Sequence, residues 1–409
     1  MPKKIKKILF LAVVILFIFI NFTSVPAKSI FENYTIKNSQ NKDLDLNLFN
    51  LKIRALMKFA HIKSLSACVI KNNTMVWSKG YGFSNRLLLQ TPTIDTNYMI
   101  GSISKVITAT ALMQLYENDS YNFELDDNVS KYLPFDFKNP NFKRVNITFR
   151  MLLAHQSSLH DHDSMKATRF LFSKNNFSYL KELLFPDGEN YLEDCWAEYP
   201  PGAEANYSNF AFILLGYLIE RISGQTYEDY CQEHIFKPLQ MKDTSFVINN
   251  INRFNLAVPY VYLPGIYIRI PRSDYMFYDP CGGLYTTIED ISHLFIAHLN
   301  DGIYKDVHIM NESTIELMHT IQYPESSPYM GNARFGLGWM IIVDKNDEPY
   351  IMGHAGDLIC YHARMFSDME GNSSVIYFYN SGAYPIFRYM MYDAHTKILN
   401  LLFEKAEDL

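Results

Sequence analysis

The stretch Met99-Ile-Gly-Ser-Ile-Ser-Lys-Val106 places a hydroxyl group and an amine three residues apart, at Ser102 and Lys105. Residues at i and i+3 share one face of a helix, so Lys105 can reach the Oγ of Ser102. A serine hydroxyl is a weak nucleophile until a neighbouring base takes its proton. The positive end of a helix dipole also favours the oxygen as it becomes an anion. This stretch therefore predicts covalent acyl transfer through Ser102.

The context of Ser102 separates it from other matches to the same spacing. Ser39–Lys42 and Ser178–Lys181 also read Ser-x-x-Lys, so the spacing alone has low specificity. Gly101 allows a tight turn just before Ser102. Apolar residues then recur at helical spacing, at Val106, Ile107, Ala109, Leu112 and Leu115. The alternative, in which Ser102 only caps a helix, explains the serine but not the lysine that faces it.

Two further motifs follow along the chain. Tyr207-Ser208-Asn209 opens an apolar helix, and His354-Ala355-Gly356 lies between the strand-like runs 350–352 and 359–366. Taken singly, each has a structural explanation: Tyr207 as a buried aromatic, Asn209 as a helix cap and His354 as a turn residue.

With these motifs in this order, the chain resembles the penicillin-binding protein and class C β-lactamase-like family of serine hydrolases. That family orders Ser-x-x-Lys, Tyr-x-Asn and Lys- or His-x-Gly along the chain. The resemblance extends over about residues 46–405, and the further stretches that carry it are 78–83, 125–134, 151–159, 235–241, 282–290 and 335–339.

The resemblance implies a role for each motif. Ser102 would be the nucleophile, Lys105 and Tyr207 the proton-transfer pair, and Asn209 an amide that orients substrate and the lysine. The backbone N–H groups of Ser102 and Asp357 would form the oxyanion hole.

The third motif would bind substrate from the strand side of the cleft, through His354 and Gly356. In the family this Lys or His binds a substrate carboxylate or supports the tyrosine. Histidine titrates near neutral pH, so His354 would bind a carboxylate as a cation only while it is protonated. Two positions depart from the family pattern. Ser158 stands where a glycine is common, and Asp357 adds a carboxylate beside the oxyanion hole.

The resemblance implies an α+β fold of the serine β-lactamase and DD-peptidase type, with an antiparallel sheet flanked by terminal helices and an inserted all-α lobe. The sequence patterns agree with it. We expect the sheet lobe at about residues 46–100 and 330–405, and the helical lobe at about 101–329. Predicted strands are 66–70, 74–78, 338–343, 350–353, 359–366 and 374–379, with helices at 46–61 and about 386–403.

Composition indicates one large globular catalytic unit. The chain has 409 residues, of which 48% are hydrophobic, and a net charge of -6, which argues against a nucleic-acid partner. The five cysteines are far apart and predict buried apolar residues rather than a disulfide framework. A metal cluster is a minor alternative, because its spacing fits a solvated loop; its residues would be His155, His160, Asp161, His162 and Asp163. We expect no metal and no cofactor.

The N-terminus is typical of a secretory signal. Four lysines precede an apolar run, Ile8–Ile20, that is shorter than the roughly 20 residues needed to span a bilayer. Val25-Pro26-Ala27 offers small residues for cleavage, so we predict a signal peptide at 1–27 and a linker at 28–45. The alternative is an uncleaved anchor, which would be the chain's one membrane contact. In both cases the protein would be secreted or lie in the cell envelope.

The expected reaction is hydrolysis of a peptide, amide or ester through an acyl-enzyme. A D-Ala-D-Ala-type peptidase or an esterase is the first choice, and a β-lactamase is the alternative. The partner would be a small-molecule or peptide substrate, such as a cell-wall peptide or a β-lactam. A hypothesis from another class is a catalytically silent penicillin-binding or sensor module. The intact Ser102, Lys105 and Tyr207 argue against it.

Overall fold

The computed structural model describes residues 42–161, 178–189, 191, 193–270, 279–323, 330–383 and 388–409. The predicted signal peptide, residues 1–27, and most of the predicted linker lie outside these described residues.

A seven-stranded sheet forms the centre of the described chain, in the order β2-β1-β13-β12-β11-β10-β9. Every neighbouring pair in it is antiparallel. The N-terminal part contributes the first two strands and the C-terminal part the other five. The strands are β1 Ser64–Lys71, β2 Thr74–Gly82, β9 Ala333–Phe335, β10 Met340–Val343, β11 Pro349–Asp357, β12 His362–Asp368 and β13 Ser373–Tyr379.

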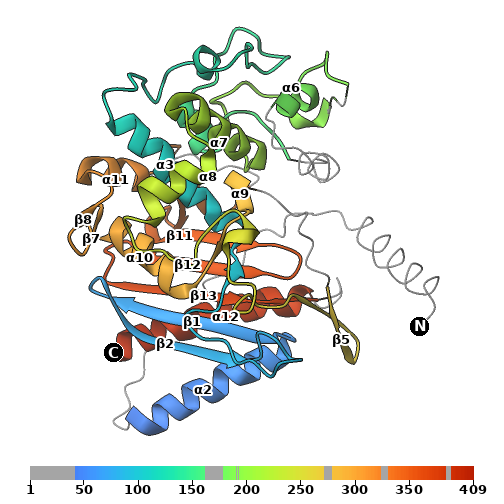
Figure 1. Cartoon of the computed structure of the whole chain (residues 1–409), viewed down its shortest axis with the longest axis vertical. Coiled ribbons are helices and arrows are strands. Elements are labelled where there is room, and N and C mark those ends of the chain that lie inside the picture. The colour runs from blue at the N-terminus through green and yellow to red at the C-terminus, as the bar shows by residue number, and fades with distance from the viewer. Residues whose placement is uncertain are drawn as a thin grey trace, which may run out of the picture.

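Helices from the two ends of the chain cover one face of this sheet. Helix α2 (Lys42–Phe59) packs against α12 (Arg388–Asp408), and α12 contacts β1 and β13 (Figure 1). Ala394, Ile398 and Leu402 repeat every four residues along α12 and are fully buried, because that spacing keeps them on one helix face. The predicted antiparallel sheet with flanking terminal helices is confirmed.

The opposite face supports the helices that build the site. Helix α3 (Ser104–Glu117) packs against α7 (Asn209–Ser223) and α9 (Asp279–Gly282). Its residues from Ser104 to Met113 are all buried, as expected of a helix that is covered on every side. The short 3₁₀ helix η1 (Gly101–Ile103) precedes α3 and contacts β11 and β12. Ser102 therefore lies where the helices meet the sheet.

The remaining elements surround this core. Helical segments are η2 Val129–Tyr132, α4 Phe149–Leu153, α6 Ser178–Leu184, η3 Glu193–Cys195, α8 Tyr227–Cys231, η4 Gln232–Phe236, η5 Ile248–Asn250, α10 Ile288–Leu299 and α11 Glu312–His319. Short strands are β3 Tyr98–Met99, β4 Tyr260–Leu263, β5 Ile266–Arg269, β6 Tyr285–Thr286, β7 Ile303–Tyr304, β8 Val307–His308 and β14 Ser381–Ala383. None of the helices in the described ranges is both long and apolar enough to cross a membrane.

Strand β9 was not predicted from the sequence, and two further local features differ from the prediction. Strand β11 continues to Asp357 instead of ending near residue 353, so the His354-Ala355-Gly356 motif lies within a strand. The stretch predicted as mostly helical also contains the antiparallel hairpin of β4 and β5. The five cysteines are buried and unbridged, as the sequence predicted.

Candidate active site

Ser102 and Lys105 meet as their spacing predicts. Lys105 is fully buried in the first turn of α3, and its Nζ donates to the Oγ of Ser102 at 3.0 Å. Gly101 has a φ of 55°, a left-handed conformation that favours glycine. The N-cap positions of η1 and α3 are Ile100 and Ile103, and neither makes a side-chain cap bond. Ser102 is therefore not a helix cap, and the alternative explanation for it fails.

Lys105 has two further acceptors. Its Nζ donates to Asn209 Oδ1 at 2.7 Å and to the carbonyl oxygen of Cys281 at 2.6 Å. An ammonium group has three N–H donors, and with Ser102 Oγ these three acceptors match them. The contacts come from η1, α7 and α9, so they tie three separate segments to one buried amine.

Tyr207 lies directly beside this pair. The Nζ of Lys105 lies 4.9 Å from the centre of its ring. Burial raises the pKa of the Tyr207 phenol, while the charge of Lys105 and hydrogen bonds with Lys105 and Ser102 lower it. The N-cap of α7 is Ser208, whose side chain accepts from the N–H of Ala211. Because Ser208 caps the helix, Asn209 remains free to face Lys105.

Asp161 is a site residue that the sequence reasoning considered only as a metal ligand. Its Oδ2 accepts from the backbone N–H of Asn209 at 2.6 Å and from the Asn209 side-chain amide at 2.7 Å. Its Oδ1 accepts from the Ser208 hydroxyl at 3.3 Å. The amide nitrogen of Asn209 is thereby turned to Asp161 and its oxygen to Lys105. Burial raises the pKa of Asp161, against the effect of the hydrogen bond from the Asn209 backbone.

Of the members of the metal alternative that the structure describes, His155 and His160 do not form a group of possible metal ligands with Asp161. His155 is buried, and its Nδ1 accepts from the N–H of Ser208 at 3.1 Å, so it supports the turn before α7. His162 and Asp163 lie outside the described residues. Ser158, where the family commonly has glycine, has a φ of 58°, which is the conformation that glycine adopts most readily.

Two glycines let β11 approach η1. A Cβ added at Gly356 would lie 1.8 Å from the carbonyl oxygen of Ile100 and 3.1 Å from the nitrogen of Ser102. A Cβ added at Gly101 would lie 3.1 Å from the nitrogen of Asp357. Only glycine fits at Gly356. The backbone nitrogens of Ser102 and Asp357, which the resemblance paired as the oxyanion hole, therefore lie on either side of this contact.

His354 lies on the strand side of the site, in β11. It is 1% exposed, and its Nδ1 donates to the carbonyl oxygen of Ala355 at 2.7 Å. Burial, with a smaller effect from the Lys105 charge, lowers its pKa to about 3. A neutral His354 cannot bind a carboxylate as a cation. Its Nδ1 carries the proton, because a carbonyl only accepts, so Nε2 remains a hydrogen-bond acceptor.

Comparisons with known sequences identify the family of this chain. A family model described as Beta-lactamase matches residues 49–393. Protein flp of Staphylococcus aureus (strain MW2) is 28% identical over 320 residues, which are 77% of this chain and 59% of that protein. Beta-lactamase-like protein 2 of Dictyostelium discoideum is 28% identical over 322 residues, 76% of this chain and 55% of that protein. The chain thus matches less than three fifths of the length of either relative.

Solved structures share the fold. The octameric penicillin-binding protein homologue of Pyrococcus abyssi has a TM-score of 0.69 at 26% identity, covering 87% of this chain and 78% of its own. The D-amino acid amidase of Ochrobactrum anthropi SV3 has a TM-score of 0.67 at 20% identity, covering 88% of this chain and 99% of its own. EstCE1, a hydrolase with promiscuous acyltransferase activity, has a TM-score of 0.64 at 18% identity, with 86% and 99% covered. Because the family model matches residues 49–393, which are most of the chain, this chain belongs to the β-lactamase family of serine hydrolases.

Proposed function

We propose that this protein hydrolyses amides or esters through an acyl-enzyme on Ser102. The observation that carries the proposal is the set of three acceptors around the Nζ of Lys105, one of which is the Ser102 Oγ itself. A buried lysine needs partners for its charge, and here they place it against the hydroxyl of Ser102, on the segment that contacts β11 and β12. A silent binding module would have no chemical need for this arrangement.

Proton accounting assigns the base. With all three Lys105 protons donated, the Oγ of Ser102 accepts one, so its own proton is directed to another group. The Tyr207 hydroxyl, whose pKa is raised by burial and lowered by the charge of Lys105 and by Ser102, is in place to take it. The positive charge of Lys105 stabilises the phenolate form of Tyr207 that this step requires. Lys105 and Tyr207 then act as one proton-transfer unit.

The reaction follows in two steps. Tyr207 takes the Ser102 proton as Oγ attacks the substrate carbonyl carbon, and the oxyanion forms between the N–H groups of Ser102 and Asp357. The carbonyl reforms, the bond to the leaving group breaks, and Tyr207 returns the proton to that group. Water then attacks the acyl-enzyme by the same route and releases the acid and free Ser102.

The charge state of His354 narrows the substrate class. A neutral imidazole offers an acceptor and no cation, so it does not favour the carboxylate of a D-Ala-D-Ala peptide or a β-lactam. An uncharged amide or ester needs no cation at His354 for its binding. The D-amino acid amidase and the hydrolase EstCE1 among the solved neighbours support this class. We therefore place an amidase or esterase before a peptidase or a β-lactamase.

We also propose that the protein acts outside the cytoplasm, secreted or in the cell envelope. The lysines and the apolar run at the N-terminus support this proposal. N-terminal sequencing of the native protein would find Lys28 or a close neighbour if the segment is cleaved, and Met1 if it is an anchor.

Labelling with a fluorophosphonate and with a fluorescent penicillin tests the proposed function. The fluorophosphonate should label the native protein but not Ser102→Ala. Ser178→Ala is the control, because Ser178 and Lys181 form a second Ser-x-x-Lys match, and it should be labelled like the native protein. The penicillin should label far more slowly, because its carboxylate finds no cation at His354. Fluorophosphonate labelling of Ser102→Ala at the native rate would refute the proposal.

A further inference from the structure

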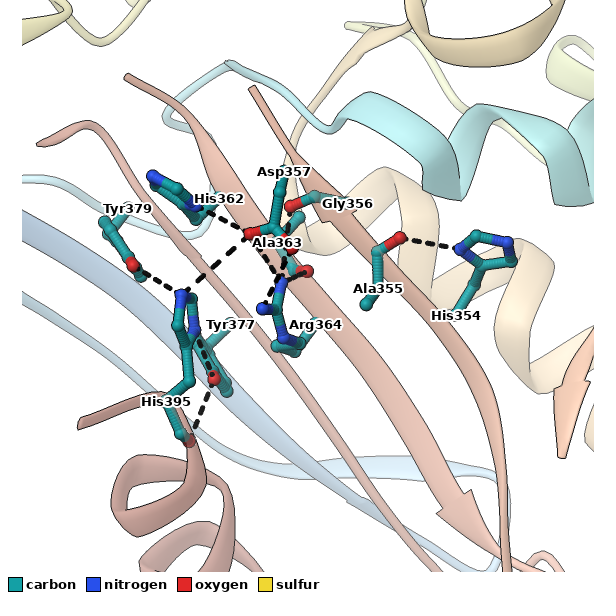
Figure 2. Close-up of polar contacts among 10 residues, drawn as sticks. All are labelled: His354, Ala355, Gly356, Asp357, His362, Ala363, Arg364, Tyr377, Tyr379 and His395. Atoms are coloured by element: carbon teal, nitrogen blue, oxygen red, sulfur yellow. Dashed lines mark hydrogen bonds and ion pairs between the residues drawn. The ribbon is translucent and has the colours of Figure 1, made fainter. Parts of the chain in front are cut away.

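Arg364 on β12 holds the peptide that joins Gly356 to Asp357 (Figure 2). Its Nη1 donates to the carbonyl oxygen of Gly356 at 3.3 Å. Nη1 and Nη2 also donate to Oδ1 and Oδ2 of Asp357, at 3.0 and 3.1 Å, and Nη1 donates to the Ala363 carbonyl at 2.8 Å. The guanidinium of Arg364 thus binds both the Gly356 carbonyl of this peptide and the side chain of Asp357, whose backbone N–H belongs to the same peptide.

The hydrogen bond from Arg364 to the Gly356 carbonyl indicates the direction of that N–H. In β11 and β12, Gly356 pairs with Ala363 and Asp357 with His362. The Gly356 carbonyl points toward β12, where Arg364 reaches it. In a trans peptide the N–H points opposite to the carbonyl, and the described chain has no cis peptide bonds. The N–H of Asp357 therefore points away from β12, toward η1.

We propose that Arg364 is a positioning residue for the oxyanion hole, an inference that rests on the proposed function. Its hydrogen bonds to the Gly356 carbonyl and the Asp357 carboxylate keep the Asp357 N–H directed toward the point where the substrate oxygen becomes an anion. A cation on the carbonyl of a peptide also polarises its N–H, which makes that group a stronger donor. Catalysis depends on such donors being in place before the reaction.

Side chains from β12, β13 and α12 hold this ion pair in place. His362 Nδ1 lies 2.6 Å from Asp357 Oδ1, and His395 Nε2 on α12 lies 3.9 Å from the same oxygen. The Tyr379 hydroxyl lies 2.6 Å from His395 Nε2. Although burial raises it, the charge of Arg364 and the hydrogen bond with His362 hold the pKa of Asp357 well below its usual range. His395 thereby connects the C-terminal helix α12 to Asp357 at the end of β11.

A metal site is the competing interpretation of the same cluster. Ligand atoms of Asp357, His362 and His395 lie within 4.8 Å of one another. However, Arg364 already neutralises the carboxylate, and its fixed positive charge 3.0 Å from Oδ1 repels a divalent ion. The geometry therefore favours a positioning role, and metal dependence becomes an outcome of the test.

The test compares Arg364→Lys and Asp357→Asn with Asp347→Asn. Arg364→Lys keeps the charge but loses the planar fork, whereas Asp357→Asn keeps the side-chain shape and the bond from Arg364 to Gly356. The control breaks a second ion pair between an arginine and an aspartate. Arg334 on β9 and Asp347, which precedes β11, lie 2.6 Å apart. Each protein is assayed with p-nitrophenyl acetate and with its thionoester, in which sulfur replaces the carbonyl oxygen and is a poor acceptor.

We expect Arg364→Lys to lower kcat for the ester at least about tenfold with KM within about twofold, since one oxyanion donor is worth about 10² to 10³ in kcat. The ester to thionoester rate ratio should fall by a similar factor, because a displaced donor no longer favours oxygen over sulfur. Asp357→Asn should show a smaller fall of the same kind. Asp347→Asn should change neither quantity, and EDTA should leave the native protein unaffected.

An unchanged ratio of ester to thionoester rates in both Arg364→Lys and Asp357→Asn would overturn the positioning role of Arg364. The proposed function would still stand if turnover depends on Ser102. Loss of activity in EDTA with recovery in Zn²⁺ would overturn the positioning role in favour of a metal site. Ester turnover at the native rate by Ser102→Ala would instead refute the proposed function, and the positioning role with it. Melting temperatures identify a variant that fails to fold, in which case the other variant decides.

Discussion

Asp161 accepts two hydrogen bonds from Asn209, from the backbone N–H at 2.6 Å and from the side-chain amide at 2.7 Å. This arrangement leaves the amide oxygen of Asn209 to accept from Lys105, 2.7 Å away. The side-chain amide of Asn209 thus connects the carboxylate of Asp161 to the amine of Lys105.

We expect Asp161→Asn to lower kcat/KM about tenfold, because a hydrogen bond to a charged group is worth roughly 1.5 to 3 kcal/mol. The new amide can donate to Asn209 and compete for its oxygen. In an Asn209→Ala background the same substitution should have little further effect, since the group that it orients is gone. Steady-state kinetics of the four proteins checks this, and equal losses in both backgrounds would argue against it.

Lys105 and Tyr207 should behave as one unit. Lys105→Met and Tyr207→Phe should each lower kcat about a thousandfold or more, and the double variant should lose little beyond the larger single loss. Tyr81→Phe is a matched control, because it removes a tyrosine hydroxyl that bonds Asn50 at 2.7 Å on the α2 face of the sheet. Losses that add in activation free energy would show that the two residues serve separate steps.

His354 should stay neutral throughout the working pH range. Its pKa, lowered to about 3, lies below the ordinary value of 6.5, so no loss of positive charge occurs between pH 5 and 8. The pH profiles of kcat/KM for a carboxylate-bearing ester and for its uncharged analogue should therefore be parallel. A selective fall of the carboxylate substrate with a midpoint near 6.5 would mean that His354 binds it as a cation.

Asp290 should make stability depend on pH. Burial raises its pKa to about 6, against hydrogen bonds from Thr244 and Asp243. The unfolded chain ionises near 3.8, so stability present below that pH is lost as the pH rises through 6. The loss is about 3 kcal/mol at 1.36 kcal/mol per pH unit.

The Asp290→Asn variant lacks this titration. Its free energy of unfolding, relative to the native protein, should rise by up to this amount between pH 4 and pH 8. Urea denaturation at the two pH values measures it, and a constant difference would show that Asp290 ionises normally.

Local patterns predicted much of the fold and part of the site. Helical spacing after Gly101 predicted α3, and the residues at i and i+3 do meet, at 3.0 Å between Lys105 and Ser102. Strand patterns near both ends predicted six of the seven strands of the sheet, all except β9. These features depend on neighbours in the sequence, which is why the sequence alone reveals them.

Features set by tertiary packing could not be read in this way. The contact of Asp161 with Asn209 joins residues 48 positions apart. The neutrality of His354 arises from burial between the sheet and the helices, and histidine as a residue type suggests the opposite. The bond from Arg364 to the Gly356 carbonyl depends on the register of β11 and β12, and β11 itself was predicted to end too early.

The most direct test of the central claim is the mass of the protein during turnover of an ester. A rapid acid quench of the native protein with excess p-nitrophenyl acetate should trap a species heavier by one acetyl group, formed with a burst of about one p-nitrophenol per protein. Peptide mapping should place the acetyl group on Ser102. A burst with the acetyl group on any other residue, or turnover of the ester by Ser102→Ala at the native rate, would contradict the account.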